Sequence, residues 1–189
     1  MKKIYKYSFL ILVSFIFFLN TGCDILENFF LNLPLKKAIT STGNGPTISE
    51  IDTICLADYD AYKDNIDEIQ NVVYVSALYR TLDKPQLTPG LTGTSITVEV
   101  RDGNNNLMFT KSLPTAVAAD YIDEPYILEL TAQEIALLNG YLALYKDEDL
   151  WNTICFTASL TVANVSGTTG PPYTLTGQVE LLLELELEP

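Results

Sequence analysis

The chain has 189 residues, enough for one domain with a sizeable core, and its 24 acidic and 11 basic residues give a net charge of −13. Such a surface repels phosphate groups, which argues against a nucleic-acid-binding protein. The absence of histidine excludes Ser-His-Asp and Cys-His triads and every histidine ligand for a metal.

The first 22 residues have the layout of an export signal. Lys2, Lys3 and Lys6 precede an uncharged apolar run over 7–19, and the small or polar residues of 20–22 follow. The run is shorter than the roughly 20 apolar residues that a membrane-spanning helix needs. We therefore expect residues 1–22 to be a signal peptide that is removed.

Residues 19–23 read LNTGC, in which Thr21 and Gly22 precede Cys23. This stretch resembles the lipobox of bacterial lipoproteins, where a small residue precedes a cysteine that is acylated and becomes the new N-terminus. The resemblance implies lipidation at Cys23 and a place in the bacterial cell envelope, at the outer membrane where the host has one. An ordinary signal peptide that leaves Cys23 free, and an uncleaved anchor, are the alternatives.

The chain after Gly22 keeps eight basic and all 24 acidic residues, a net charge of −16. Because such a body repels anionic lipids, its contact with a membrane is expected to run through the acyl chains alone. Residues 23–46 are predicted to be a tether with a possible first strand, and 47–189 a β-sandwich domain. Alternatively, apolar residues between Ile25 and Leu33 form a helical stripe at the membrane surface.

Short β-like runs separated by turn residues fill the rest of the chain. The predicted strands are 31–40, 51–57, 72–82, 94–101, 107–113, 126–130, 153–165 and 173–188. In the last of these, leucine and valine alternate with glutamate from Val179 to Glu188, interrupted only by Leu182. This period of two indicates a strand with one buried face, which we expect to be paired inside a sheet.

Two local signals join these strands. The turn formers of 102–106, DGNNN, predict a hairpin between the fourth and fifth strands. Thr131 and Glu134 have capping-box spacing ahead of a helical apolar stripe, which predicts one inserted helix near 131–146. The expected fold is mainly β, an antiparallel, immunoglobulin-like β-sandwich of seven or eight strands.

Two further cysteines stand in matching words, Thr-Ile-Cys, ending at Cys55 and Cys155. Their apolar neighbours, Ile54 and Leu56 in one case and Ile154 and Phe156 in the other, place both cysteines on the side of their strands opposite the core. If the strands are adjacent, an exported protein would keep a disulfide there. Two unpaired thiols are the alternative.

Candidate ligand-binding residues are few. Asp58, Asp60 and Asp64 offer oxygen ligands for calcium, but Tyr62 and Lys63 stand where an EF-hand loop needs a ligand and a glycine, so a solvated loop is the favoured interpretation. Tyrosines are plentiful, and they either form a contact surface for a protein or a glycan or pack half-buried in strands.

No enzyme motif is present in the sequence, and no cofactor is expected. The predicted function is therefore that of a non-enzymatic, lipid-anchored binding or structural module of the cell envelope, with a protein or glycan partner. A carrier or chaperone for an apolar ligand is the alternative. A glycosidase with paired carboxylates is a third possibility, because acidic residues are abundant but no pair is marked by its spacing.

Overall fold

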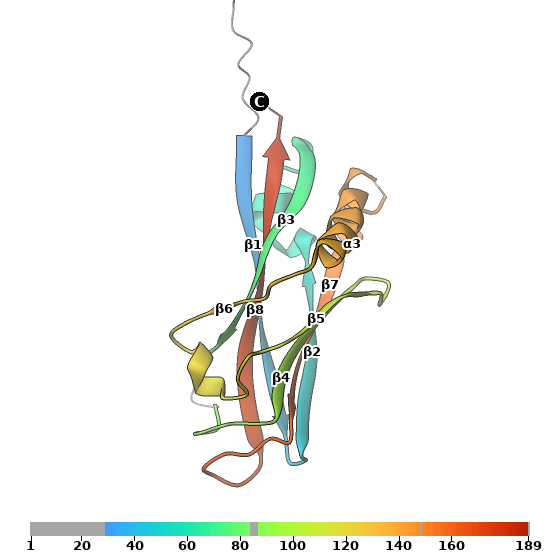
Figure 1. Cartoon of the computed structure of the whole chain (residues 1–189). Coiled ribbons are helices and arrows are strands. Elements are labelled where there is room, and N and C mark those ends of the chain that lie inside the picture. Colours follow the sequence, from blue (N-terminus) through green and yellow to red (C-terminus); the bar gives the residue numbers. More distant parts are fainter. Residues whose placement is uncertain (1–28, 84–86, 148, 189) are drawn as a thin grey trace, which may run out of the picture.

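The computed structural model describes residues 29–83, 87–147 and 149–188. Two antiparallel four-stranded sheets pack face to face (Figure 1). The strands are β1 (Phe29–Gly43), β2 (Thr47–Cys55), β3 (Ile69–Thr81), β4 (Ser95–Asp102), β5 (Leu107–Ser112), β6 (Tyr126–Ile127), β7 (Cys155–Ala163) and β8 (Tyr173–Leu187). The predicted antiparallel β-sandwich is confirmed, and each predicted strand overlaps an observed one.

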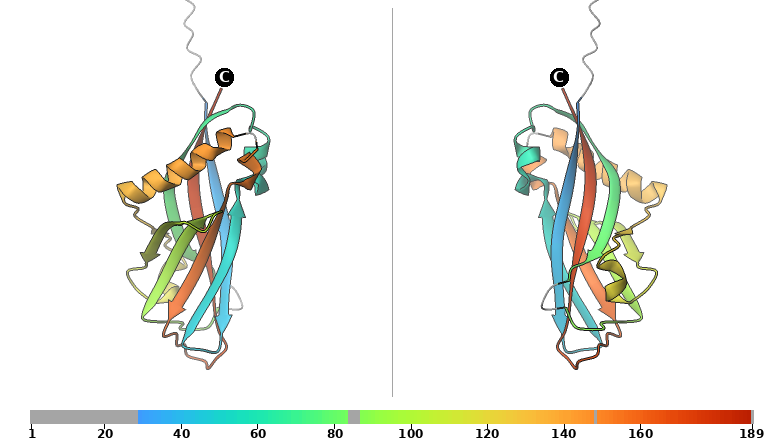
Figure 2. Two further views of the ribbon diagram at one scale, coloured as in Figure 1. Left: turned by 90° about the vertical axis from the view of Figure 1, so that its right-hand side faces the viewer. Right: turned by 90° about the vertical axis from the view of Figure 1, so that its left-hand side faces the viewer.

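Short helices connect the strands. They are η1 (Leu56–Asp58), α2 (Asp60–Lys63), η2 (Ala118–Tyr121), α3 (Ala132–Leu142), η3 (Ala143–Lys146) and η4 (Trp151–Thr153), where η marks a 3-10 helix. Figure 2 shows α3 lying across one edge of the sandwich, near the end at which the last strand stops. The predicted helix near 131–146 is therefore confirmed as α3 continued by η3.

The strand order is that of a jelly roll. One sheet has the order β1-β8-β3-β6 and the other β2-β7-β4-β5, so the chain pairs first with last, second with seventh, third with sixth and fourth with fifth, as in two interlocked Greek keys. In an immunoglobulin constant domain the first two strands share one sheet. Here β1 and β2 lie in different sheets, and the immunoglobulin-like prediction is not confirmed.

The core is formed by the inward faces of both sheets. In β8, Val179, Leu181, Leu183 and Leu185 are almost fully buried, while the glutamates between them lie on the outer face. Strand β8 runs between β1 and β3, which confirms that it is paired inside a sheet. Strand β8 is hydrogen-bonded to a neighbour on each side. Only one of its two faces is apolar, because only that face packs against the other sheet.

Strand β1 belongs to the sandwich from its first described residue. All fifteen residues of β1 pair with β8, starting with Phe29 opposite Leu187. Leu33 and Leu35 point into the core. The helical alternative is wrong for residues 29–33, and Ile25 and Leu26 lie outside the described residues.

Helix α3 is held at its start by the predicted capping box. The backbone N–H of Glu134 donates to Thr131 Oγ1, and the Glu134 carboxylate accepts the backbone N–H of Thr131. The same carboxylate lies 2.7 Å from Lys111 Nζ of β5. Further along, Asn139 Oδ1 accepts the backbone N–H of Tyr74 in β3. The helix thus spans from one sheet to the other.

Replacing Glu134 by glutamine should lower the free energy of unfolding by roughly 0.5 to 1 kcal/mol. Burial alone would raise the pKa of this carboxyl, but the hydrogen bonds from Lys111 and Thr131 lower it below its ordinary 4.5. The stabilisation is therefore complete above the unfolded-state pKa and is lost as pH falls through the lower folded-state pKa. Urea unfolding between pH 6 and pH 3, a range chosen to span that loss, should show a weaker pH dependence for Glu134→Gln, and equal slopes would contradict the assignment.

Candidate functional site

The two ends of the sandwich differ. We call one of them the tether end: it contains the start of β1, the start of β3 and the end of β8, and there Phe29 and Ile69 both pair with Leu187. The predicted lipidation residue, Cys23, lies outside the described residues, and β1 begins at this end (Figure 1). No helix within the described ranges is long and apolar enough to cross a bilayer.

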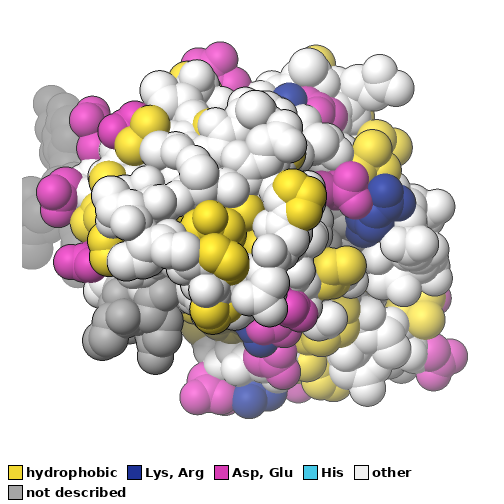
Figure 3. Space-filling view, turned by 90° about the horizontal axis from the view of Figure 1, so that it is seen from below, with side chains coloured by type: hydrophobic (Ala, Val, Ile, Leu, Met, Phe, Trp, Pro, Cys, Tyr) yellow, Lys and Arg dark blue, Asp and Glu magenta, His cyan; other side chains and the backbone are white. Residues whose placement is uncertain are grey.

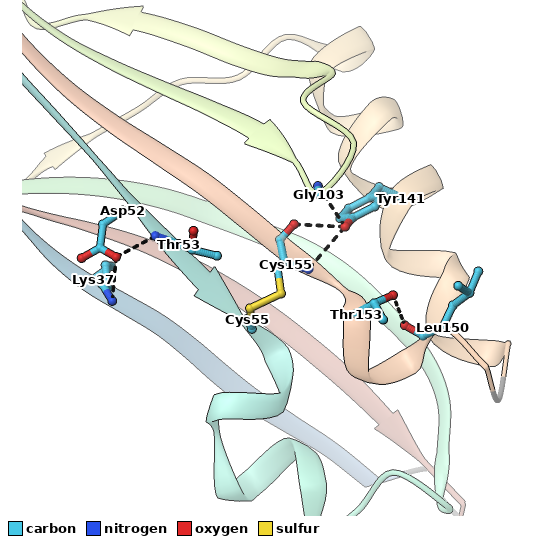
Figure 4. The surroundings of a disulfide bond; sticks show 9 residues. All are labelled: Lys37, Asp52, Thr53, Cys55, Gly103, Tyr141, Leu150, Thr153 and Cys155. Atoms are coloured by element: carbon cyan, nitrogen blue, oxygen red, sulfur yellow. Dashed lines mark hydrogen bonds and ion pairs between the residues drawn. A yellow bond between two sulfur atoms is a disulfide. The ribbon is translucent and has the colours of Figure 1, made fainter.

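A disulfide joins Cys55 and Cys155 near the tether end (Figure 4). The two residues are opposite each other at the ends of β2 and β7, 100 positions apart in the sequence. Ile54 and Phe156 beside them are buried, so the cysteines lie on the outer face as predicted. The predicted disulfide is confirmed.

Tyr141 belongs to helix α3, and its hydroxyl links the helix to strand β7 at Cys155. It donates to the carbonyl oxygen of Cys155 at 3.0 Å, and it accepts the backbone N–H groups of Cys155 and Gly103 (Figure 4). The Tyr141 ring also meets Phe156 edge to face, with centroids 5.4 Å apart. One side chain therefore connects α3, β7 and the turn between β4 and β5.

The predicted metal ligands lie in the segment between β2 and β3. Asp58 ends η1, Asp60 begins α2 and Asp64 caps it. Asp60 forms an ion pair of 2.7 Å with Lys63, which lowers the pKa of its carboxyl. Within residues 29–83, 87–147 and 149–188, no cluster of three or more acidic or cysteine side chains is suited to hold a metal ion, so the structure gives the metal site no support.

A cavity of about 580 Å³ opens at the tether end, between residues 66–70, which lead into β3, and the segment from η3 to η4. Its apolar wall consists of Ile66, Ile69, Tyr145 and Trp151, and its polar groups are Asp67, Gln70 and Lys146. Sequence reasoning missed this cavity. The residues come from two segments about 80 positions apart, and neither segment carries a motif.

Two tyrosine hydroxyls are buried beside this cavity. The hydroxyls of Tyr62 and Tyr145 are inaccessible to solvent, and neither has a hydrogen-bond partner within the part of the chain that the structure describes. Burial raises the pKa of Tyr145 to about 12, with a smaller contribution from the charge of Glu186, and burial likewise raises the pKa of Tyr62. Buried polar groups without partners are rare and mark a place where water or a ligand fits.

The opposite end of the sandwich, which we call the loop end, includes three connecting segments without charged side chains. The stretches 44–46, 87–94 and 164–172 contain no charged residue, and uncharged atoms occupy the middle of the view from this end (Figure 3). Thr92 and Ser166 exchange two backbone hydrogen bonds of 2.9 Å, and Thr168 donates to the carbonyl of Pro89. These bonds hold the loops against one another.

A close approach of two loops requires glycine at residue 90. Gly90 has a φ of +64°, and a Cβ there would lie 2.7 Å from the Thr168 methyl group. Glycine adopts this left-handed conformation without the steric cost that other residues incur. The loop end is therefore a preformed surface.

Four of the tyrosines that the sequence offers for a contact surface are packing residues. Tyr79, Tyr121 and Tyr141 are buried in the core, and Tyr126 is partly buried against it. Tyr79, Tyr121 and Tyr126 form consecutive edge-to-face contacts. Tyr79 in β3 and Tyr126 in β6 therefore confirm the interpretation that tyrosines in strands are packing residues, and Tyr121 and Tyr141 pack in the same way from η2 and α3.

Comparison with known proteins finds distant structural similarities only. Neither a protein-family model nor a curated protein matches the chain. A structure of Desmodium yellow mottle tymovirus covers 86% of this chain and 89% of its own, with 10% identity and a TM-score of 0.39. For turnip yellow mosaic virus the values are 86%, 83%, 12% and 0.40, and for tobacco necrosis virus 85%, 97%, 12% and 0.35. Similarities this distant bear on neither activity nor partner.

Proposed function

We propose that the mature chain is a non-enzymatic binding or structural module, held at the bacterial cell envelope by acyl chains on Cys23. The main observation in support of the proposal is the position of strand β1. Cys23 precedes Phe29 by six positions, a reach of at most about 21 Å, and Phe29 lies at the tether end of the sandwich. An anchor on Cys23 would hold that end close to the bilayer.

The disulfide supports export of the chain. Disulfides persist in oxidising compartments such as the periplasm and the cell surface, and they are rare in the cytosol. The Cys55–Cys155 bond is therefore consistent with the signal-peptide layout of residues 1–22. The two features are independent, because one comes from the N-terminal sequence and the other from the pairing of β2 with β7.

The titratable groups support a role without catalysis. Catalytic sites gather groups whose pKa values are shifted within one cleft. In the described part of this chain, the strongest shifts belong to tyrosines raised by burial, and shifts at Asp60, Lys63 and Glu134 come with their ion pairs. Such pKa shifts arise from burial of tyrosines in the packed interior and from ion pairs at the surface.

The loop end is the surface that such an anchor would present to the surroundings. It lies at the far end of the sandwich from Phe29, and its loops are held in place by mutual hydrogen bonds. A preformed surface loses little conformational entropy on binding. Because the three segments lack charge on a strongly acidic chain, a neutral protein or glycan surface fits them best. The alternative of an apolar-ligand carrier has less support, since packed side chains fill the space between the sheets.

Metabolic labelling of host cells with an alkyne-bearing fatty acid tests the anchor. The wild-type chain should carry the label and sediment with membranes, whereas Cys23→Ser should lose both, because Cys23 is the proposed site of acylation. The double variant Cys55→Ser/Cys155→Ser is the matched control and should keep the label. An unlabelled wild-type chain, expressed and exported normally, would refute the proposal.

A further inference from the structure

The cavity at the tether end combines features that point to one class of ligand. We propose that it binds a neutral saccharide, with an apolar face of the sugar ring against Trp151 and the sugar hydroxyls on Asp67, Gln70 and Lys146. This proposal gives the binding role proposed above a ligand class, and it rests on that proposed function only in assuming that the chain is a binding protein. It does not require acylation of Cys23.

The charges around the cavity disfavour an anion or a metal ion as its ligand. The described residues of the lining include one cationic side chain, Lys146, and one carboxylate, Asp67. The acidic residues Glu68, Asp147 and Asp149 neighbour the lining residues in the sequence. An anion such as a phosphate would be repelled by this surplus of carboxylates. A metal ion is also disfavoured, because the described residues contain no suitable cluster of ligands.

The polar groups match what a sugar offers. Each sugar hydroxyl both donates and accepts a hydrogen bond. Asp67 supplies acceptors only, Lys146 donors only, and Gln70 both. All three side chains are exposed, so they are free to turn toward a ligand. A purely apolar ligand would leave these groups without partners and is therefore a poorer fit.

Trp151 provides the flat apolar surface. It is partly exposed in the cavity wall, and its ring lies 6.3 Å from that of buried Tyr62, at a tilt of 39°. Tyr62 thus packs against the indole and restricts its movement. An aromatic ring with restricted freedom is the kind of side chain that contributes most at binding sites, because little entropy is lost when a ligand covers it.

Tyr145 adds a polar group at the inner wall. The residue lines the cavity, and its buried hydroxyl has no partner among the described residues. Because this hydroxyl is closed to solvent in the unliganded chain, the side chain would have to turn toward the cavity before a sugar hydroxyl, or a water between sugar and protein, could supply that partner. Tyr62 has the same unpartnered hydroxyl but does not line the cavity, which makes it a matched control.

Tryptophan fluorescence reads this site directly, because Trp151 is the only tryptophan in the chain. The purified full chain in detergent should be titrated with glucose, galactose, mannose and N-acetylglucosamine, and with their β-linked disaccharides. A saturable shift of the emission is expected for at least one neutral sugar. Absence of a saturable change for all of them, up to their solubility limits, would overturn the proposal. Saturation by inorganic phosphate or glucuronate alone would overturn it equally.

Three variants separate binding from folding, with affinity measured by isothermal calorimetry. Trp151→Ala should weaken sugar binding about tenfold or more. Tyr145→Phe should weaken it several-fold while leaving the thermal unfolding midpoint unchanged or higher, since it removes an unpartnered buried hydroxyl. Tyr62→Phe should leave the affinity unchanged. Equal affinities of all three variants and the wild type would place the sugar elsewhere and overturn the assignment.

A second experiment identifies whether the sugar belongs to a membrane lipid or to a soluble glycan. Binding to vesicles that contain a neutral glycolipid, compared with phosphatidylcholine vesicles and with free oligosaccharide, distinguishes a membrane headgroup from a soluble glycan. The Cys23→Ser chain should bind free sugar as the wild type does. Loss of fatty-acid label with intact sugar binding would refute the anchor alone, and intact label without sugar binding would refute this site alone.

Discussion

Replacing Cys55 and Cys155 together by serine should lower the free energy of unfolding by about 4 to 5 kcal/mol. The bond links residues 100 positions apart, and cross-linking so long a loop strongly restricts the unfolded chain. For a domain whose whole stability is about 5 to 15 kcal/mol, this is a large share. Urea unfolding of the oxidised wild type and of the double variant measures the difference.

Two comparisons check the origin of that loss. The wild type unfolded in the presence of a reductant should match the double variant, because both lack the covalent link. Cys23→Ser should unfold like the oxidised wild type, since Cys23 lies before the sandwich. A difference below about 1 kcal/mol between the double variant and the wild type would show that the pairing of β2 with β7 alone determines the stability of this region.

Replacing Tyr141 by phenylalanine should lower the free energy of unfolding by about 2 kcal/mol. The hydroxyl makes three hydrogen bonds, to the backbone N–H and carbonyl of Cys155 and to the N–H of Gly103. The ring contact with Phe156 would remain, so the change isolates the polar contribution. Thermal and urea unfolding of the two proteins give the measurement.

Tyr62→Phe provides the matched control for that experiment. The same atom is removed from another buried tyrosine, but the hydroxyl of Tyr62 has no partner within the described residues. The variant should be as stable as the wild type or slightly more stable, because a buried unpaired hydroxyl is costly. If both variants lost the same stability, the network around Tyr141 would not explain the effect.

The stability of this region bears on the proposed function. Tyr141 and the disulfide hold the segment that follows α3, and that segment carries Tyr145 and Trp151 of the cavity. A rigid support keeps binding groups in place and lowers the cost of ordering them. We therefore expect Tyr141→Phe to weaken sugar binding modestly, even though Tyr141 lies outside the cavity lining.

Much of the fold was predictable because its signals are local. The alternation from Val179 to Glu188 predicts β8, since successive side chains of a strand face opposite sides. The turn residues of 102–106 predict the hairpin of β4 and β5, where Asn105 has a φ of +66°. Thr131 and Glu134 predict the start of α3, because a capping box needs only residues three apart.

The sequence by itself therefore determined the class of the protein: a chain with an export-signal layout, seven or eight strands, one capped helix and two cysteines on the outer faces of their strands. The tertiary structure alone decided which strands are neighbours. Only the jelly-roll order sets β2 beside β7, which brings Cys55 and Cys155 together, and only the packing of η3 and η4 near the start of β3 assembles the cavity. The physical reason is that hydrophobic periodicity reports which face of a strand is buried, whereas pairing between distant segments depends on the geometry of the whole chain.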